Sequence, residues 1–147
     1  MSLACNADFH GQWELKSKCS CPDYLAYVET LFTAETRMNK NTEILHKFLM
    51  FSGICYNCFQ EFSLTAEIGS KGVQIRYGAY ELVLAHNSEE FFMTLDEILE
   101  ICNSVKHWKY NLLTLNCYQF VQKMVQIFRS KCQTFNEVFT AVKEKMK

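Results

Sequence analysis

The sequence predicts an α+β fold in which a small antiparallel sheet packs against helices. Residues 22–51 carry apolar side chains at helical spacing, and residues 55–85 are rich in β-forming residues that alternate with polar ones. Residues 94–102 and 117–131 return to helical spacing. Helices, then a sheet, then helices is an order typical of an α+β domain.

Two helices are expected in the first third of the chain. Pro22 suits the first position of a helix that runs to about Met38. This helix would bury Leu25, Val28, Leu31 and Phe32. Asn41 is a candidate N-cap for a second helix over residues 42–51, which Gly53 would stop. Before them, residues 1–21 are expected to form an extended or irregular arm, with a possible strand at residues 12–16.

The middle of the chain is expected to form the sheet. Strands are predicted at residues 55–62, 64–68 and 73–85, with a turn at 69–72 and a connector from Asn87 or Ser88. Thr94 and Glu97 have the spacing of a capping box, which predicts that a helix begins there. That helix would bury Leu95, Ile98, Leu99 and Cys102.

The last third is expected to hold an extended stretch at residues 108–115 and a helix over 117–131. Thr134 or Asn136 would cap a final short helix. We therefore expect one domain over residues 1–147: an arm and two helices at 1–53, a core at 54–131 and a basic C-terminal helix at 132–147.

Composition indicates a globular protein, because 49% of residues are hydrophobic and 21% charged. No apolar run approaches the roughly 18 residues that a membrane span requires. The N-terminus lacks the basic flank and apolar core of a signal peptide. Eight cysteines without such a signal favour a reducing compartment, so we expect a cytoplasmic protein with mostly free thiols.

Charge is distributed unevenly along the chain. Residues 1–100 carry 14 acidic and 7 basic side chains, whereas residues 101–147 carry 2 acidic and 8 basic ones. The basic residues of this last part are Lys106, Lys109, Lys123, Arg129, Lys131, Lys143, Lys145 and Lys147. Such asymmetry predicts a face that binds a polyanion such as RNA, although solvated helix surfaces carry lysines too.

An aromatic and basic cluster adds to this expectation. His107, Trp108, Lys109 and Tyr110 are consecutive, and side chains of these kinds stack on unpaired bases and contact phosphates. The alternative is a strand edge with Trp108 and Tyr110 in the core.

Cys117 stands at the start of the predicted helix 117–131, directly after Asn116. The first turn of a helix combines unsatisfied N–H groups with the positive end of the helix dipole, which stabilises a thiolate. Cys117 is therefore a candidate nucleophile, while a buried, inert thiol is the alternative. Asn116 is more simply a helix cap than a catalytic group.

Residues 64–128 resemble the H-box/NC family, the lecithin:retinol acyltransferase-like thiol enzymes. Residues 75–80, Ile-Arg-Tyr-Gly-Ala-Tyr, are similar to its H-box, and Asn116-Cys117 followed by Phe120 is similar to its NC motif, in the family's order. The resemblance implies a permuted papain-like (NlpC-type) core. Arg76 stands where the family has its catalytic histidine, and His86 matches the second polar position. Since arginine stays protonated, it cannot act as a general base.

Small members of this family without a membrane anchor are the 2A proteins of several picornaviruses, and this chain looks most similar to the parechovirus group. The resemblance implies a viral nonstructural protein in the host cytoplasm, acting in viral RNA replication and binding RNA or host factors, with a degenerate thiol site. An active cysteine acyltransferase, thioesterase or phospholipase using Cys117 and His86 is the alternative.

A third interpretation is an interaction module held together by zinc. Cys19-x-Cys21 and Cys55-x-x-Cys58 supply two close pairs of thiols, and four thiolates are a common ligand set for structural zinc. Buried free thiols are the competing interpretation of the same residues. Otherwise no cofactor is expected.

Overall fold

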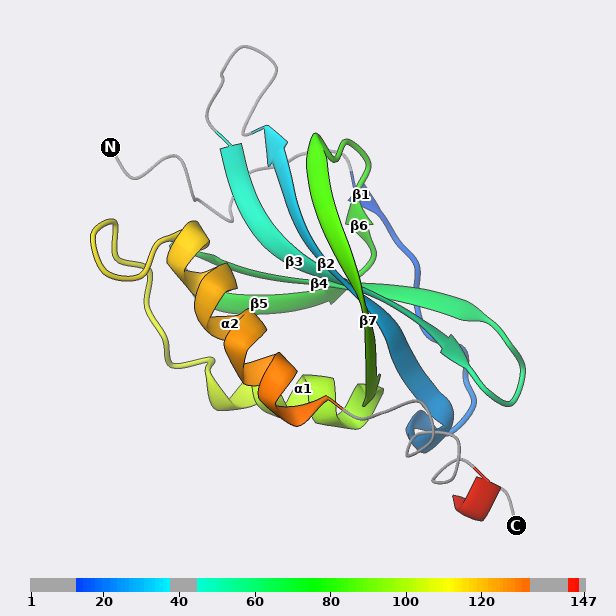
Figure 1. Cartoon of the computed structure of the whole chain (residues 1–147). Helices are drawn as coiled ribbons and strands as arrows, with labels where there is room; N and C mark the ends of the chain where they lie inside the picture. Colours follow the sequence, from blue (N-terminus) through cyan, green and yellow to red (C-terminus); the bar gives the residue numbers. More distant parts are fainter. Residues whose placement is uncertain (1–12, 38–44, 133–142, 146–147) are drawn as a thin grey trace.

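The computed structural model describes residues 13–37, 45–132 and 143–145 and shows a five-stranded antiparallel sheet with two helices on one face (Figure 1). The strand order is β5-β4-β3-β2-β7, and a separate two-stranded sheet pairs β1 with β6. The elements are β1 (Trp13–Glu14), η2 (Asp23–Leu25), β2 (Ala26–Arg37), β3 (Leu45–Cys55), β4 (Glu61–Gly69), β5 (Gly72–Tyr77), β6 (Ala79–Tyr80), β7 (Ala85–Thr94), α1 (Leu95–Ser104) and α2 (Cys117–Lys131). The expected α+β class is confirmed.

The two helices predicted in the first third are wrong, because this part of the chain forms the long antiparallel pair of β2 and β3. Their register runs from Ala26 opposite Cys55 to Arg37 opposite Leu45. Apolar side chains project to both faces of this pair, because both faces are covered. The sequence therefore lacks the alternation of apolar and polar residues that marks a half-exposed strand. The expected cap Asn41 lies outside the described residues.

Gly53 was expected to stop a helix, and it instead lets β3 pass close to its neighbours. A Cβ atom at this position would lie 2.4 Å from the carbonyl oxygen of Tyr27 and 2.5 Å from the ring of Phe62. Close approach of backbone to backbone is a common reason for glycine within a strand.

The later elements agree better with the sequence. Thr94 caps α1 by accepting a hydrogen bond of 3.1 Å from the backbone N–H of Glu97. The predicted turn at 69–72 joins β4 to β5. Three boundaries differ from the prediction. Residues 55–62, expected as one strand, span the β3–β4 turn, and the connector expected from Asn87 is part of the strand β7. Residues 108–115, expected to be extended, hold only an isolated bridge between Asn111 and Leu115. Thr134 and Asn136 lie outside the described residues, while residues 143–145 are helical.

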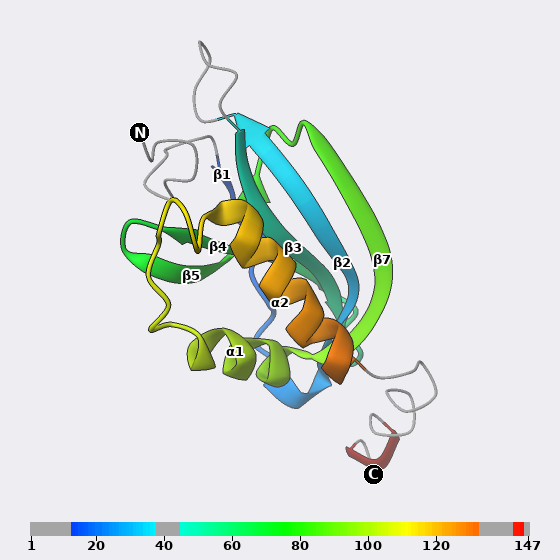
Figure 2. The same cartoon turned by 60° about the vertical axis from the view of Figure 1, so that its left-hand side comes forward.

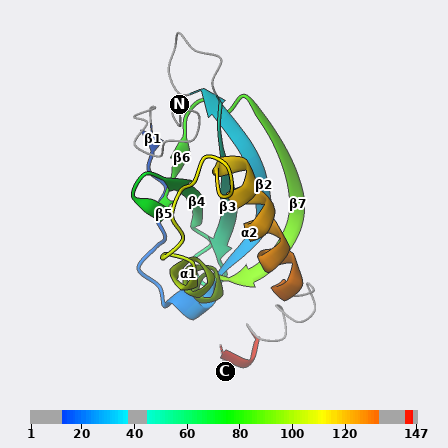
Figure 3. The same cartoon turned by 90° about the vertical axis from the view of Figure 1, so that its left-hand side faces the viewer.

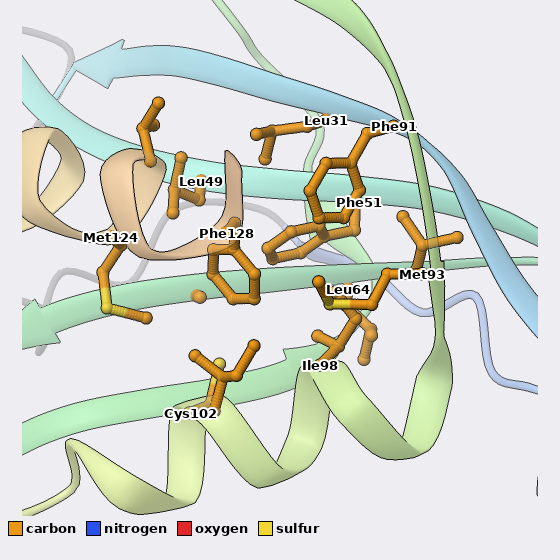
Figure 4. Packing of buried hydrophobic residues seen from close by; sticks show 14 of the residues in the cluster. Leu31, Leu49, Phe51, Leu64, Phe91, Met93, Ile98, Cys102, Met124 and Phe128 are labelled. Carbon is orange, nitrogen blue, oxygen red and sulfur yellow. The ribbon is translucent and has the colours of Figure 1, made fainter. Parts of the chain in front are cut away.

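The main core lies between the sheet and the two helices, which Figure 2 shows crossing the same face of the sheet. Phe51 of β3, Phe91 of β7 and Phe128 of α2 meet there, with ring centroids 5.1 to 6.2 Å apart. Met124 and Cys102 project into the same space (Figure 4). Burying each large apolar side chain contributes roughly 1.5–3 kcal/mol, so this layer is the main source of stability.

The opposite face of the sheet is covered by the small β1–β6 sheet and by the chain that follows β1. Trp13 and Tyr80 pack edge to face at 5.0 Å, and Phe48 of β3 lies beneath Tyr80 at 5.0 Å. From β1 the chain continues down one side of the molecule to η2, drawn in blue in Figure 3. No helix among the described residues is both long and apolar enough to cross a membrane.

Candidate metal centre

Four cysteine sulfurs from two distant segments meet at the end of the β3–β4 hairpin. Cys19 and Cys21 come from the chain before η2, Cys55 ends β3, and Cys58 lies in the turn that follows. All four Sγ atoms lie within 4.8 Å of one another. In a tetrahedral site with zinc–sulfur bonds of about 2.3 Å, the sulfurs are about 3.8 Å apart, so the observed spacing suits one ion.

The turn after β3 has the local geometry that directs two thiols to one point. The backbone N–H of Phe59 donates to the carbonyl oxygen of Cys55 at 2.8 Å, and that of Cys55 donates to Gln60 at 3.0 Å. Phe59 has a φ of 64°, in the left-handed region that favours glycine. This tight turn returns Cys58 to the side of Cys55.

Hydrogen bonds to sulfur prepare Cys55 to be a thiolate. The N–H of Asn57 donates to the Cys55 Sγ at 3.4 Å, and the Asn57 side chain donates to the Cys21 Sγ at 3.4 Å. Burial raises the pKa of Cys55, but hydrogen bonds from the backbones of Cys58 and Asn57 and from neighbouring thiols outweigh it and lower this pKa to about 7. Burial raises the pKa of Cys19 to about 12. A divalent cation would displace the remaining protons, because metal ligation requires thiolates.

Lys18 places a positive charge beside this group of thiols. It donates to the carbonyl oxygen of Cys21 and forms an ion pair of 2.8 Å with Asp23. Burial alone lowers the pKa of Lys18, but the hydrogen bond to Asp23 and nearby negative charges, that of Cys19 included, raise it overall. A site with four thiolates and one divalent cation carries two negative charges, which Lys18 would partly balance.

Arg76, the residue at the expected H-box histidine position, takes part in a different cluster. Its guanidinium donates to Glu67 at 2.9 Å and lies 3.8 Å above the Trp13 ring. Glu67 is fully buried and also binds His46 at 2.8 Å and the hydroxyl of Tyr80. Local spacing carries no signal for this cluster, because its members come from five strands, β1, β3, β4, β5 and β6.

Cys117 belongs to the other face of the sheet. Ile75 and Tyr77, the neighbours of Arg76, pack against the same core as Cys117, whereas Arg76 projects from the opposite face toward Glu67. Cys117 is fully buried, and its sulfur is in a disulfide. The structure therefore does not bring Arg76 to Cys117.

Asn116 is the cap of α2. Its side chain accepts from the N–H of Gln119 at 3.0 Å, and the Gln119 side chain accepts from the Asn116 N–H at 2.8 Å. This reciprocal pair is a capping box, in agreement with a cap rather than a catalytic group.

The three histidines of the described residues lie in separate places. His46 is buried with Glu67, and His107 is exposed in the turn after α1. His86 stands in β7 opposite Ala34 of β2. Helix α2 packs over β3 and β4, whereas β7, the strand that carries His86, lies two positions from β3 and three from β4 in the sheet.

The basic residues of the last third are spread over several surfaces. Lys106 and Lys109 are exposed in the α1–α2 connector, Lys131 is exposed at the end of α2, and Lys147 lies outside the described residues. Three others make specific contacts: Lys123 with the Trp108 ring at 5.8 Å, Lys145 with the Tyr24 ring at 5.5 Å, and Arg129 with Glu89 at 2.8 Å. Lys143 is exposed. Trp108 is half-buried and meets Phe120 edge to face at 6.3 Å.

Comparisons with protein-family models, with curated proteins and with solved structures find no match for this chain.

Replacing Glu67 by Gln is expected to lower the free energy of unfolding at pH 7 by about 3 kcal/mol, because Arg76 would lose a buried carboxylate partner. Burial raises the pKa of Glu67, but hydrogen bonds from His46, Tyr80 and Arg76 outweigh it and lower this pKa. The carboxylate therefore stabilises the fold fully above its unfolded-state pKa, near 4.3, and this contribution disappears as the pH falls through the lower folded value.

Urea unfolding from pH 7 down to pH 3 measures this difference. Glu61→Gln on the same strand is the matched control, and because its ion pair with Lys16 is exposed we expect a change within about 1 kcal/mol. An effect of Glu67→Gln that stays constant over this pH range would contradict the assignment of a charged Glu67.

Cys117 is expected to react with iodoacetamide at least about tenfold more slowly than exposed Cys132, because its sulfur is in a disulfide and is buried, so it must be both reduced and exposed before it can react. Mass spectrometry of the native protein in a mild reductant, over a series of times, gives both rates. Selective and rapid labelling of Cys117 at neutral pH would instead identify an activated nucleophile.

Proposed function

We propose that this chain is a binding protein whose N-terminal segment is fastened to its sheet by one zinc ion, and that it has no catalytic activity. The observation that carries this proposal is the convergence of the sulfurs of Cys19, Cys21, Cys55 and Cys58 within 4.8 Å. The two pairs are 34 positions apart, from Cys21 to Cys55, so the fold and not local sequence brings them together.

The ligand set favours a structural role for the metal. Four thiolates fill the tetrahedral sphere of zinc and leave no position for water or a substrate. The ion would join the segment before η2 to the β3–β4 turn. Cluster cofactors fit less well, because their thiolates bind different iron atoms and are held farther apart.

RNA is the partner that we propose. Support comes from the exposed Lys106, His107 and Lys109 in one connector, beside the half-buried Trp108 ring with Lys123 above it. Lysines bind phosphates through charge, and an accessible aromatic ring edge or face contacts unpaired bases. Arg129 contributes less, since Glu89 already neutralises it.

A relationship to the H-box/NC family, to its permuted papain-like core and to picornavirus 2A proteins is also a proposal, together with a role in viral RNA replication in the host cytoplasm. Its support is the order of the two motifs and the position of Cys117 in the first turn of α2, after the cap Asn116. Within this proposal the thiol site is degenerate, because Arg76 binds Glu67 and Cys117 is buried. For the same reasons we do not favour an active acyltransferase.

The protein purified without chelator is expected to contain one zinc ion per chain, measured by elemental analysis. Cys58→Ser should lose this ion, and Cys132→Ser, which changes an exposed cysteine outside the group, should retain it. If free zinc exceeds its dissociation constant a thousandfold, its removal lowers the free energy of unfolding by about 4 kcal/mol. Cobalt substitution should give the absorption of a tetrahedral thiolate site. Equal metal contents in the two variants would reject the site.

RNA binding is expected to weaken with salt, and Lys106→Gln with Lys109→Gln should reduce the slope of log K against log salt by about 1.4, at about 0.7 per phosphate contact. Fluorescence anisotropy with a single-stranded RNA of mixed sequence measures this slope. The matched control is Lys16→Gln with Arg37→Gln, which removes the same charge elsewhere and should leave the slope unchanged. Zinc content without RNA binding would reject RNA as the partner and leave the metal site in place.

A further inference from the structure

The chain between β1 and η2 runs beside β4 on the side of the sheet away from the helices, where Lys16 contacts Ser63 and Glu61. Residues 15–22, which we name the strap, connect Trp13–Glu14 to η2 and contain Cys19 and Cys21. Figure 3 shows this segment running along one side of the molecule.

Each end of the strap has an anchor that does not depend on a metal. At one end the Trp13 indole N–H donates to the carbonyl oxygen of Tyr77 at 3.0 Å, and its ring packs on Arg76 and Tyr80. Gly78 admits this contact, since a Cβ there would lie 2.7 Å from the Trp13 indole nitrogen. At the other end Leu25 is buried, and its carbonyl oxygen accepts from Tyr56 at 2.9 Å.

The middle of the strap has much weaker attachments. Leu15, its large apolar residue, is 70% exposed and anchors nothing. The Lys16 carbonyl oxygen accepts from Ser63 at 3.1 Å, the Ser17 carbonyl oxygen accepts from Gln60 at 3.3 Å, and Lys16 forms an exposed ion pair with Glu61. Exposed ion pairs and single hydrogen bonds each contribute little to holding a segment in place.

A cavity of about 250 Å³ lies between the beginning of this segment and the sheet. Glu14 and Lys16 form its outer border, and Phe32, Met50 and Ser63 are among the sheet residues that line it. Movement of the strap would therefore open one side of this cavity and expose half-buried apolar side chains of β2 and β3.

We propose that metal binding by the four cysteines controls the strap: with the ion bound the strap closes over the sheet, and without it residues 15–22 detach while both ends stay anchored. This inference rests on the proposed zinc site and adds a local, metal-dependent opening to it. Two thiolates in the strap, one at the end of β3 and one in the turn that follows make the ion the strongest link between the strap and the β3–β4 hairpin. Because the main core lies on the other face, losing this link does not unfold the domain.

The test is limited trypsin digestion of the full chain, loaded with zinc or treated with a zinc-selective chelator, with peptides identified by mass spectrometry. Cleavage after Lys16 and Lys18 is expected to become at least about tenfold faster on zinc removal, because cleavage follows the population of the open segment. Cleavage after Lys71, in the exposed β4–β5 turn, is the internal control and should not change. Cys58→Ser should behave like the chelated protein, and Cys132→Ser like the zinc-loaded protein.

The possible results separate this inference from the zinc site itself. Bound zinc with unchanged cleavage after Lys16 and Lys18 would overturn the strap and leave the metal site intact. Bound zinc whose removal also exposes Lys47 and Arg76, within β3 and β5, would show that the ion holds the whole domain and would overturn a local opening. Absence of metal from the purified protein, and failure to bind added zinc, would overturn both proposals.

Discussion

Burial of both faces of the β2–β3 pair is the constraint on which the rest of the structure depends. Leu49 and Phe51 project toward the helices, and Phe48 projects toward Tyr80 on the other side. One face is covered by α1 and α2, which bring a large apolar surface from the last third of the chain. The other must be covered by what remains, namely the short β1–β6 sheet and the segment that follows β1.

This second layer is small, and polar contacts attach it to the five-stranded sheet. Its center is the buried carboxylate of Glu67, which joins β3, β5 and β6 through His46, Arg76 and Tyr80. A buried carboxylate with several donors fixes the geometry of its partners, since leaving any of these donors unpaired is costly. The ring of Trp13 packs on the Arg76 guanidinium. The contact between Trp13, at the start of the N-terminal segment, and the sheet therefore depends on a charged side chain.

Between Trp13 and Leu25 the segment buries no large apolar side chain, and a chain without buried side chains gains little to offset its loss of conformational entropy. Two of the four cysteines, Cys19 and Cys21, lie in this interval, and the other two lie beside it at the end of the β3–β4 hairpin. A metal ion supplies binding energy where hydrophobic burial is absent, as in small domains whose cores are insufficient. The thiols that could bind a metal therefore lie where the fold has the least hydrophobic packing. Cys117 lies in the main core and is packed as a core residue.

The sequence by itself determined the later helices and the local chemistry of the thiols. The capping residues Thr94 and Asn116 are visible because a cap needs a side-chain acceptor only three residues from its donor. Likewise, each cysteine pair is recognisable from its own spacing. The tertiary structure decided what depends on distant residues. Residues 26–37 and 45–55 are strands because a second layer covers the face of the sheet opposite the helices, and Arg76 and Cys117 lie on opposite faces of that sheet. The tertiary structure also brought Cys21 and Cys55 together across 34 positions, because the β2–β3 pair returns the chain to its starting end.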